Sequence, residues 1–187
     1  MLNSIIIPAK NEPYLPLLLG KINKIIDAEI LVETAEGLGQ AVRNGIKKSK
    51  GDNIIIIDAD GQHNPKYLPK FIEALETHEM VIGSRYLDGG GDQREFYRKI
   101  MSKIATTLAK LKLNNGIKDP LSGFFGFRKK ILNKINLNCN GFKIGFEILM
   151  KTKPTVKEIP VIIEKRKIGE SKANFKEIVR VVNLLCR

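Results

Sequence analysis

The chain has 187 residues, of which 43% are hydrophobic, and this length and composition predict a single soluble domain with a substantial core. No apolar run approaches the roughly 20 residues that a membrane-spanning helix needs, and the first residues lack the basic segment of a signal peptide. The net charge of +12 is uneven, because residues 96–187 hold 21 Lys and Arg against 6 Asp and Glu, whereas residues 1–95 hold 11 against 14.

Strands and helices alternate along the first half of the chain. Aliphatic runs predict strands at residues 2–7, 29–33, 53–58 and 79–84, and amphipathic stretches predict helices at residues 13–26, 38–48 and 65–76. Helices of this length between strands are typical of parallel βαβ units. The pattern therefore predicts the α/β fold class, with a doubly wound, Rossmann-like and mainly parallel sheet flanked by helices.

The second half is less regular. Residues 88–92 (DGGGD) predict a flexible break, and residues 94–113 predict one long helix with an apolar stripe. The stripe consists of Ile100, Ile104, Leu108 and Leu111. Beyond this helix, the pattern predicts a strand at residues 124–127, a helix at 145–151, a strand at 156–164, a basic loop at 165–172 and a final helix at 174–185. Pro160 places the last strand at a sheet edge, because proline cannot donate to a central ladder.

The segment at residues 54–65, IIIIDADGQHNP, carries the clearest chemical signal. Its aliphatic run predicts a buried strand, so Asp58 and Asp60 follow at the carboxyl edge of the sheet, where α/β proteins bind ligands. Two carboxylates, with Gln62 adding a neutral oxygen, suit Mg²⁺ or Mn²⁺ that holds a substrate phosphate. A turn that happens to contain two aspartates is the alternative, and these residues alone leave both open.

The basic second half predicts an anionic partner. Nucleic acid and an anionic membrane surface both fit, and a solvated lysine-rich surface is the alternative. Nucleic acid is disfavoured, because only four Tyr and eight Phe accompany the lysines and no recognition motif is present. Cys139 and Cys186 have neither metal-site spacing nor the density of a disulfide scaffold, which indicates a reducing, cytoplasmic location.

Nine segments, including residues 54–65 and spread over nearly the whole chain, form an ordered set. They are IIIPAKNE (5–12), GLGQAVRNGI (37–46), IIIIDADGQHNP (54–65), VIGSRY (81–86), RKIMS (98–102), DPLSGFFGFRK (119–129), GFKIGFEILMK (141–151), EIPVIIEKR (158–166) and GESK (169–172). Together they resemble the dolichyl-phosphate mannosyltransferase branch of the family 2 inverting glycosyltransferases. The resemblance implies a GT-A fold in a single domain over residues 1–187, with residues 1–93 binding the nucleotide sugar and residues 94–187 binding the acceptor.

The resemblance also implies roles for the residues of the donor site. Pro8, Lys10 and Glu12 line the nucleotide pocket; Asp58, Ala59, Asp60 and Gln62 hold the metal and the donor diphosphate; Arg85 lies near the donor; and Arg166 and Lys172 close over the phosphates. The chain departs from the family after the second strand, where EILVETAEGLGQ runs directly into a helix without the usual acidic turn. Glu33 is the residue expected to stand in for the missing aspartate.

Arg98 and Ser102 match the helix positions that meet the acceptor's phosphate. Being four residues apart, they share a helix face and can grip one phosphate, although a solvated Arg98 is the alternative from the residues alone. A phosphomonoester has a second pKa of about 6 and arrives ionised, so it needs no general base. The expected catalytic residues are Asp60, Arg85, Arg98 and Ser102, which align and stabilise a single displacement that inverts the anomeric carbon.

The sequence thus predicts a metal-dependent inverting glycosyltransferase that moves a hexose, mannose from GDP-mannose, to a polyprenyl or dolichyl phosphate. Its expected partners are the nucleotide sugar, the lipid phosphate and a membrane, with the protein peripheral on the cytoplasmic face or held there by a separate membrane-anchoring subunit, and no nucleic acid. The alternatives are a related transferase that uses a UDP-sugar or another acceptor, and a non-catalytic homologue that binds nucleotide or lipid.

Overall fold

A computed structural model describes residues 1–166 of the chain except residues 36, 134 and 138–143. The predicted helix at 174–185, Lys172 and both cysteines lie outside the described residues. In chain order the elements are β1 (Asn3–Pro8), α1 (Leu15–Asn23), β2 (Glu29–Glu33), α2 (Leu38–Lys48), β3 (Asn53–Ile56), the 3-10 helix η1 (Pro65–Tyr67), α3 (Leu68–Thr77), β4 (Met80–Ser84), β5 (Gly91–Asp92), α4 (Phe96–Leu113), β6 (Phe125–Arg128), the 3-10 helix η2 (Lys129–Leu132), α5 (Ile144–Thr152), β7 (Val156–Pro160) and β8 (Ile162–Ile163).

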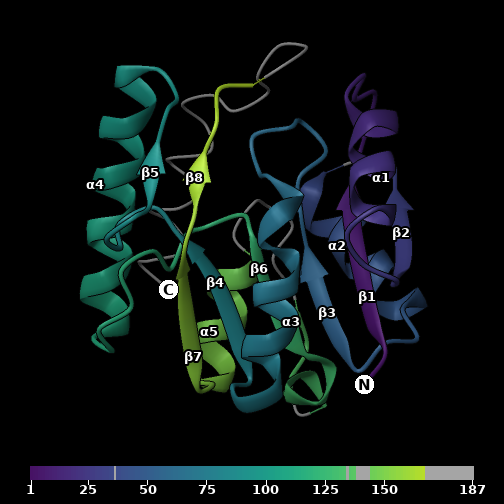
Figure 1. The fold of residues 1–187 in the computed structure, drawn as a ribbon. Helices are drawn as coiled ribbons and strands as arrows, with labels where there is room; N and C mark the ends of the chain where they lie inside the picture. The colour runs from purple at the N-terminus through teal and green to yellow at the C-terminus, as the bar shows by residue number, and fades with distance from the viewer. Residues whose placement is uncertain (36, 134, 138–143, 167–187) are drawn as a thin grey trace.

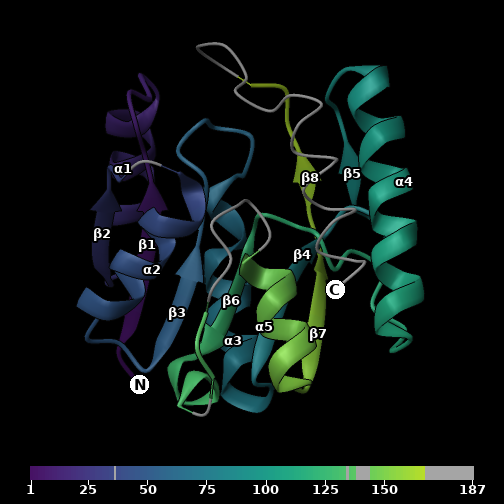
Figure 2. The same cartoon turned by 180° about the vertical axis from the view of Figure 1, so that it is seen from behind.

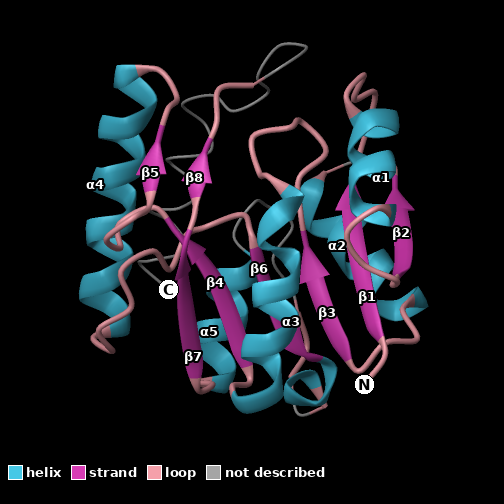
Figure 3. Cartoon of the chain, in the orientation of Figure 1, coloured by secondary structure: helices cyan, strands magenta, loops and turns pink. Residues whose placement is uncertain are grey.

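A six-stranded sheet forms the centre of the molecule, in the order β2-β1-β3-β6-β4-β7 (Figure 1, Figure 3). β1 pairs in parallel with β2 and β3, and β4 pairs in parallel with β7. β6 lies between β3 and β4 and is antiparallel to both. The predicted α/β fold with a mainly parallel sheet is therefore confirmed, and β6 is the strand that makes the sheet mixed.

Helices cover both faces of the sheet because its central strands are apolar on both sides. In β1, Ile5 and Ile7 belong to the core cluster that contains residues of α1 and α3, whereas Ile6 belongs to the cluster with residues of α2 and α5. Figure 1 shows α1 and α3 on the near face, and Figure 2 shows α2 and α5 on the opposite face. With both faces covered, a ligand has access to the ends of the strands.

Three predicted segments differ from the structure. The strand predicted over residues 53–58 ends at Ile56. Residues 88–92, predicted as a flexible break, contain β5, which pairs in parallel with β8. The strand predicted over residues 156–164 is divided after Pro160, because the chain passes there from the central sheet to the two-stranded sheet. β7 is nevertheless the edge strand that Pro160 predicts.

Helix α4 stands at one side of the molecule, beside β5 and β8 (Figure 1). Its inner face is narrow, with Thr106 and Ala109 buried and Ala109 packed in a small cluster with Leu121 and Phe146. The predicted apolar stripe faces solvent instead of the core. The exposed fractions of Ile100, Ile104, Leu108 and Leu111 are 43%, 51%, 41% and 74%. Within the described ranges, no helix combines the length and the apolar character needed to cross a bilayer.

The turn after β3 is shaped by Gly61 and Tyr14. Gly61 has a φ of +77°, in the region that favours glycine, and a Cβ there would lie 2.8 Å from Cε1 of Tyr14. Tyr14 is 3% exposed, and Lys21 donates a hydrogen bond to its hydroxyl at 2.9 Å. The buried ring therefore packs against the backbone of the turn that carries Asp58 and Asp60.

Gly61→Ala should destabilise the fold more than Gly116→Ala does. Gly116 has a φ of +79° with nothing within 4 Å of an added Cβ, so its alanine variant measures backbone strain alone. That strain is about 1–2 kcal/mol, and the contact with Tyr14 adds roughly 1–3 kcal/mol to Gly61→Ala. Urea unfolding measures both free energies. Equal losses would show that the Tyr14 ring yields to the methyl group without cost.

Candidate active site

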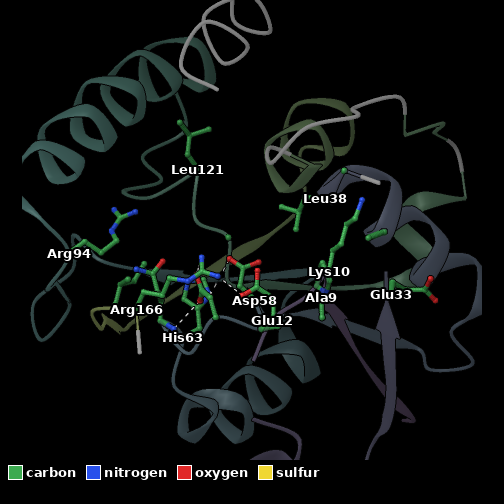
Figure 4. A pocket seen from close by; sticks show the side chains of 18 of the residues that line it. Ala9, Lys10, Glu12, Glu33, Leu38, Asp58, His63, Arg94, Leu121 and Arg166 are labelled. Atoms are coloured by element: carbon green, nitrogen blue, oxygen red, sulfur yellow. Dashed lines mark hydrogen bonds and ion pairs between the residues drawn. The ribbon is translucent and has the colours of Figure 1, made fainter. Parts of the chain in front are cut away.

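The carboxyl ends of β1, β2, β3 and β4 open into one cavity of about 390 Å³ (Figure 4). Every predicted site residue within the described ranges lines it: Pro8, Lys10, Glu12, Glu33, Asp58, Ala59, Asp60, Gln62, Arg85, Arg98, Ser102 and Arg166. Lys172 lies outside the described residues. His63, Arg94 and Leu121, which the sequence did not single out, also line the cavity.

Asp58 and Asp60 lie on the turn that leaves β3, and their side chains are 31% and 16% exposed. The buried strand ahead of them fixes this turn, since the N–H of Ile57 still donates to the carbonyl of Ile6 at 3.2 Å. The N–H of Gln62 donates to Oδ1 of Asp60 at 3.0 Å. Burial raises the pKa of Asp60, and the hydrogen bond from Gln62 opposes that rise.

The oxygen atoms of this turn fit a hard divalent cation. Asp58 and Asp60 offer carboxylates, and Gln62 directs its amide nitrogen to the carbonyl of Glu164 at 3.4 Å, which leaves its amide oxygen for another partner. Such a set suits Mg²⁺ or Mn²⁺. In the described part of the chain, no three His, Cys, Asp or Glu side chains gather into a metal site of their own. A cation here would therefore take further oxygen ligands from a bound phosphate or from water.

Arg166 connects the turn after β3 with the loop after β1. Its guanidinium forms an ion pair with Glu12, and its Nη1 lies 3.8 Å from Oδ2 of Asp60. Its charge also counteracts the effect of burial on the pKa of Asp60. Arg166 thus lies beside Asp60, one of the two predicted metal-binding carboxylates, and its predicted closure over the donor phosphates stays a prediction.

Glu33 ends β2 and is 5% exposed. Lys48 at the end of α2 binds its carboxylate, with Nζ 2.9 Å from Oε1 and 3.1 Å from Oε2. Figure 4 shows Glu33 at the opposite side of the view from Arg94. The short connection to α2 contributes Ala35 and Gly37 to the cavity wall. The predicted base-recognition residue is therefore at the cavity, with its charge already balanced by a lysine.

Arg85 follows β4 and is 7% exposed. Its Nε and Nη2 donate to the two carboxylate oxygens of Asp119, each at 2.6 Å, and its Nη1 donates to Oγ of Ser102 at 2.5 Å. Burial lowers the pKa of Arg85, but the hydrogen bonds and charge of Asp119 outweigh burial and hold that pKa above its usual range. Arg85 is predicted to lie near the donor, and in the structure its contacts also join the sheet to helix α4 at Ser102.

Two more arginines extend the positive charge at the α4 end of the cavity. Arg94 binds both carboxylate oxygens of Asp92, through Nε at 2.9 Å and Nη2 at 2.6 Å. The same carboxylate lies 3.8 Å from Nη1 of Arg85. Arg98, one turn before Ser102, has Glu95 as an ion-pair partner at 3.3 Å. The α4 end of the cavity is therefore arginine-rich, as a phosphate site requires.

His63 is buried beside the predicted metal site. Its ring lies 5.2 Å from that of Phe124, and its Nδ1 lies 3.7 Å from Oδ2 of Asp58. Burial, together with the charges of Arg85 and Arg94, lowers its pKa to about 3. The imidazole is therefore neutral at physiological pH, and it is too weak a base to remove a proton from an alcohol.

Two residues near α4 were not identified from the sequence: Arg94, which lines the cavity, and Asp119, which binds the cavity-lining Arg85. Arg94 falls at the boundary between the predicted break and the long helix, where no pattern marks a site. Asp119 belongs to the DPLSG segment, which contributed to the resemblance without a role. A buried arginine requires a carboxylate partner, and that requirement is the signal that could have led from Arg85 to Asp119.

Comparison with known sequences gives consistent matches. A profile of the family described as Glycosyl transferase family 2 matches residues 23–136. The dolichol-phosphate mannosyltransferase of Pyrococcus furiosus is 42% identical over 157 residues, which are 81% of this chain and 45% of that protein. The enzyme of the same name from Saccharomyces cerevisiae is 36% identical over 172 residues, 85% of this chain and 63% of that protein. The chain thus spans about half the length of the curated relatives that it matches.

Solved structures share the fold at low sequence identity. One is glucosyl-3-phosphoglycerate synthase from Mycobacterium tuberculosis in complex with Mn²⁺, UDP and glucosyl-3-phosphoglycerate. The TM-score is 0.68 at 16% identity, and the superposition covers 99% of this chain and 77% of the synthase chain. The complex of the same synthase with Mg²⁺ and UDP has a TM-score of 0.69 at 14% identity, and the superposition covers 99% of this chain and 79% of the synthase chain. These similarities confirm the predicted GT-A type of fold.

Proposed function

The chain belongs to glycosyl transferase family 2, and on that basis we propose that it is an inverting glycosyltransferase that moves mannose from GDP-mannose to a polyprenyl phosphate such as dolichyl phosphate. The observation that carries this proposal is that one cavity holds two kinds of group. Asp58 and Asp60 supply carboxylates from the turn after β3, and Arg85, Arg98 and Ser102 supply phosphate-binding groups from the end of β4 and from α4. The dolichol-phosphate mannosyltransferases that match the chain support the choice of sugar and acceptor.

The donor diphosphate is proposed to lie on the turn after β3. Asp58, Asp60 and Gln62 would hold Mg²⁺ or Mn²⁺, which when bound supplies charge to neutralise the departing nucleoside diphosphate. The Mn²⁺ and Mg²⁺ complexes of the structural neighbours with UDP support a divalent ion in this fold. Pro8, Lys10 and Glu12 would line the nucleotide pocket, Ala59 would approach the donor through its backbone, and Arg166 with Lys172 would close over the phosphates.

The acceptor phosphate is proposed to lie against helix α4. Arg98 and Ser102 line the cavity from this helix, and Arg85 reaches Ser102 from β4. A phosphomonoester is largely ionised at neutral pH, since its second pKa is about 6, so it attacks without a general base. The neutral His63 agrees with such a mechanism, because its low pKa makes it unsuitable as that base. Attack in line on the anomeric carbon inverts its configuration.

The two halves of the chain take different parts of this work. We assign the nucleotide sugar to residues 1–93 and the acceptor to residues 94–187, within a single domain. Contacts of the cavity arginines cross this division, since Arg85 contacts Ser102 of the second half and Arg166 contacts Glu12 of the first. Glu33 remains the proposed contact for the nucleotide base of the donor. Because its carboxylate is paired with Lys48, the main question of donor identity is whether this residue selects GDP-mannose or a UDP-sugar.

Helix α4 supports a membrane surface as a partner. Its exposed stripe begins at Phe96, which is 77% exposed, and continues to Leu111. Lys99, Lys103 and Lys110 are exposed on the same helix. An apolar stripe accompanied by lysines suits an interfacial helix on an anionic bilayer. We propose peripheral binding to the cytoplasmic face, with a separate membrane-anchoring subunit as the other partner that would cover this stripe.

Lipid-linked sugar formation tests the proposed reaction. With Mn²⁺ and dolichyl phosphate, GDP-mannose should give product, whereas UDP-glucose and UDP-N-acetylglucosamine should give none. Asp60→Ala should reduce the rate by roughly a hundredfold or more, because charge on the departing diphosphate loses its stabilisation. Asp27→Ala, which removes an exposed carboxylate outside the cavity, is the matched control and should keep the wild-type rate.

Product from a UDP-sugar alone would move the donor assignment to a uridine nucleotide. Absence of product from every donor would leave a binding protein instead of an enzyme. Product formed at the wild-type rate by Asp60→Ala would refute the metal assignment.

Binding to vesicles tests the role of α4. Ile104→Asp should weaken binding to vesicles of phosphatidylcholine and phosphatidylglycerol by roughly tenfold, because one buried Ile contributes about 1.5 kcal/mol or more. Leu17→Asp is the matched control, since Leu17 on α1 is 54% exposed and Ile104 is 51% exposed. Sedimentation with the vesicles measures both affinities. Equal losses in the two variants, or none in Ile104→Asp, would rule out the stripe as the membrane contact.

A further inference from the structure

Asp119 is a fully buried carboxylate beside the cavity and does not line it. It accepts hydrogen bonds from Nε and Nη2 of Arg85, each at 2.6 Å, and from the backbone N–H of Arg85 at 3.1 Å. Bidentate pairing of this kind fixes both the position and the plane of a guanidinium group. The guanidinium of Arg85 is therefore held along its Nε–Nη2 edge by one residue.

The third arm of Arg85 is the one that reaches the proposed acceptor site. Nη1 donates to Oγ of Ser102 at 2.5 Å, across the space between β4 and α4. A hydroxyl that accepts a hydrogen bond still carries its own hydrogen, which Ser102 can donate to a phosphate oxygen. The direction in which Arg85 and Ser102 present their donors is thus set by the carboxylate of Asp119.

The segment that carries Asp119 is itself held by the sheet. Glu158 of β7 accepts hydrogen bonds from the N–H groups of Lys118 and Asp119, at 2.8 Å and 2.9 Å. Glu158 also faces Ile82 of β4 in the parallel pairing of these strands. A continuous set of contacts therefore runs from β7 through Asp119 and Arg85 to α4.

We propose that Asp119 is a positioning residue for the acceptor phosphate, acting through Arg85 and Ser102. This inference rests on the proposed function of the same site, to which it adds the group that aligns the acceptor. Alignment matters because displacement at a sugar carbon requires the attacking oxygen in line with the leaving group, and small misplacements of a reactant are costly. The contact from Nη1 of Arg85 to the cavity-lining Ser102 is what links this ion pair to the proposed acceptor site.

Asp119→Asn is the informative substitution, because asparagine keeps the size of the side chain and one oxygen acceptor. It should raise the dissociation constant of farnesyl phosphate, used as a short lipid phosphate, by roughly tenfold or more, as expected for weakening a charged hydrogen-bonded pair. The dissociation constant of GDP with Mn²⁺ should stay within about twofold of wild type, since the carboxylate of Asp119 hydrogen-bonds to Arg85 and not to the groups proposed to hold the donor. Calorimetry measures both constants.

A double-mutant cycle separates positioning from folding. In the Arg85→Gln background, Asp119→Asn should cause no further loss of farnesyl phosphate binding, because its effect passes through Arg85. Glu147→Gln is the matched control: it removes the charge of a buried carboxylate on α5, whose Oε1 lies 2.7 Å from Nζ of Lys151, and Glu147 does not line the cavity. It should lower stability without changing the affinity for farnesyl phosphate.

Loss of the buried charge can also prevent folding, so Asp119→Glu is a second variant that keeps the charge. Its longer side chain should displace the guanidinium of Arg85, which again weakens the binding of farnesyl phosphate and leaves the binding of GDP unchanged. Wild-type affinity for farnesyl phosphate in folded Asp119→Asn or Asp119→Glu would overturn the inference. An equal loss of affinity for GDP and for farnesyl phosphate would also overturn it, as would additive losses from Asp119→Asn and Arg85→Gln in the double-mutant cycle. If the wild-type protein bound no lipid phosphate at all, both the proposed function and the role of Asp119 would be refuted.

Discussion

The buried ion pair between Arg85 and Asp119 holds the arginine that connects the sheet to Ser102 of helix α4, the helix that faces the proposed acceptor. Without it, helix α4 would join the core chiefly through the small residues Thr106 and Ala109. Removing one partner of such a pair leaves an uncompensated buried charge, which costs about 3–5 kcal/mol, so the two residues hold each other in place. The position of the α4 end of the cavity relative to Asp58 and Asp60 therefore depends on this contact.

Paired charges are a general property of the cavity. Arg166 lies between Glu12 and Asp60, Arg94 binds Asp92, and Lys48 binds Glu33. Each pair orients a group before any ligand arrives, so little reorganisation is needed when phosphate charge enters. The same pairing explains how a cavity rich in arginine and carboxylate groups is tolerated in a low-dielectric environment. A phosphate ligand would join this network as an additional anion beside groups already held in position.

The sequence predicted the α/β class and several element boundaries because local patterns determine them. β2 and α2 lie at the predicted residues 29–33 and 38–48, since an aliphatic strand is followed by Gly37 and an amphipathic helix. The antiparallel course of β6 and the pairing of β5 with β8 were missed, because strand direction and two-residue ladders depend on tertiary contacts. The stripe of α4 was predicted, but periodicity alone does not say whether the core or solvent lies beside it.

The candidate site shows the same division. Ordered motifs identified the cavity-lining residues from Pro8 to Arg166, and the structure brings those it describes around one cavity. Motifs did not reveal that Asp119 binds Nε and Nη2 of Arg85, because the two residues are 34 positions apart and only the fold joins them. Arg94 was missed for a similar reason, since its proximity to the cavity depends on the turn made by β5.

The central claim is that the acceptor phosphate lies beside the metal-bound donor site, and ³¹P nuclear magnetic resonance with Mn²⁺ tests it most directly. Mn²⁺ accelerates the relaxation of nearby phosphorus nuclei, and the effect falls steeply with distance. The relaxation of farnesyl phosphate bound together with GDP therefore reports how close its phosphate lies to the metal. Strong enhancement of relaxation is expected for both ligands in the wild-type protein. Enhancement for GDP with none for farnesyl phosphate would show that the lipid phosphate binds away from the donor site and would contradict the proposed arrangement.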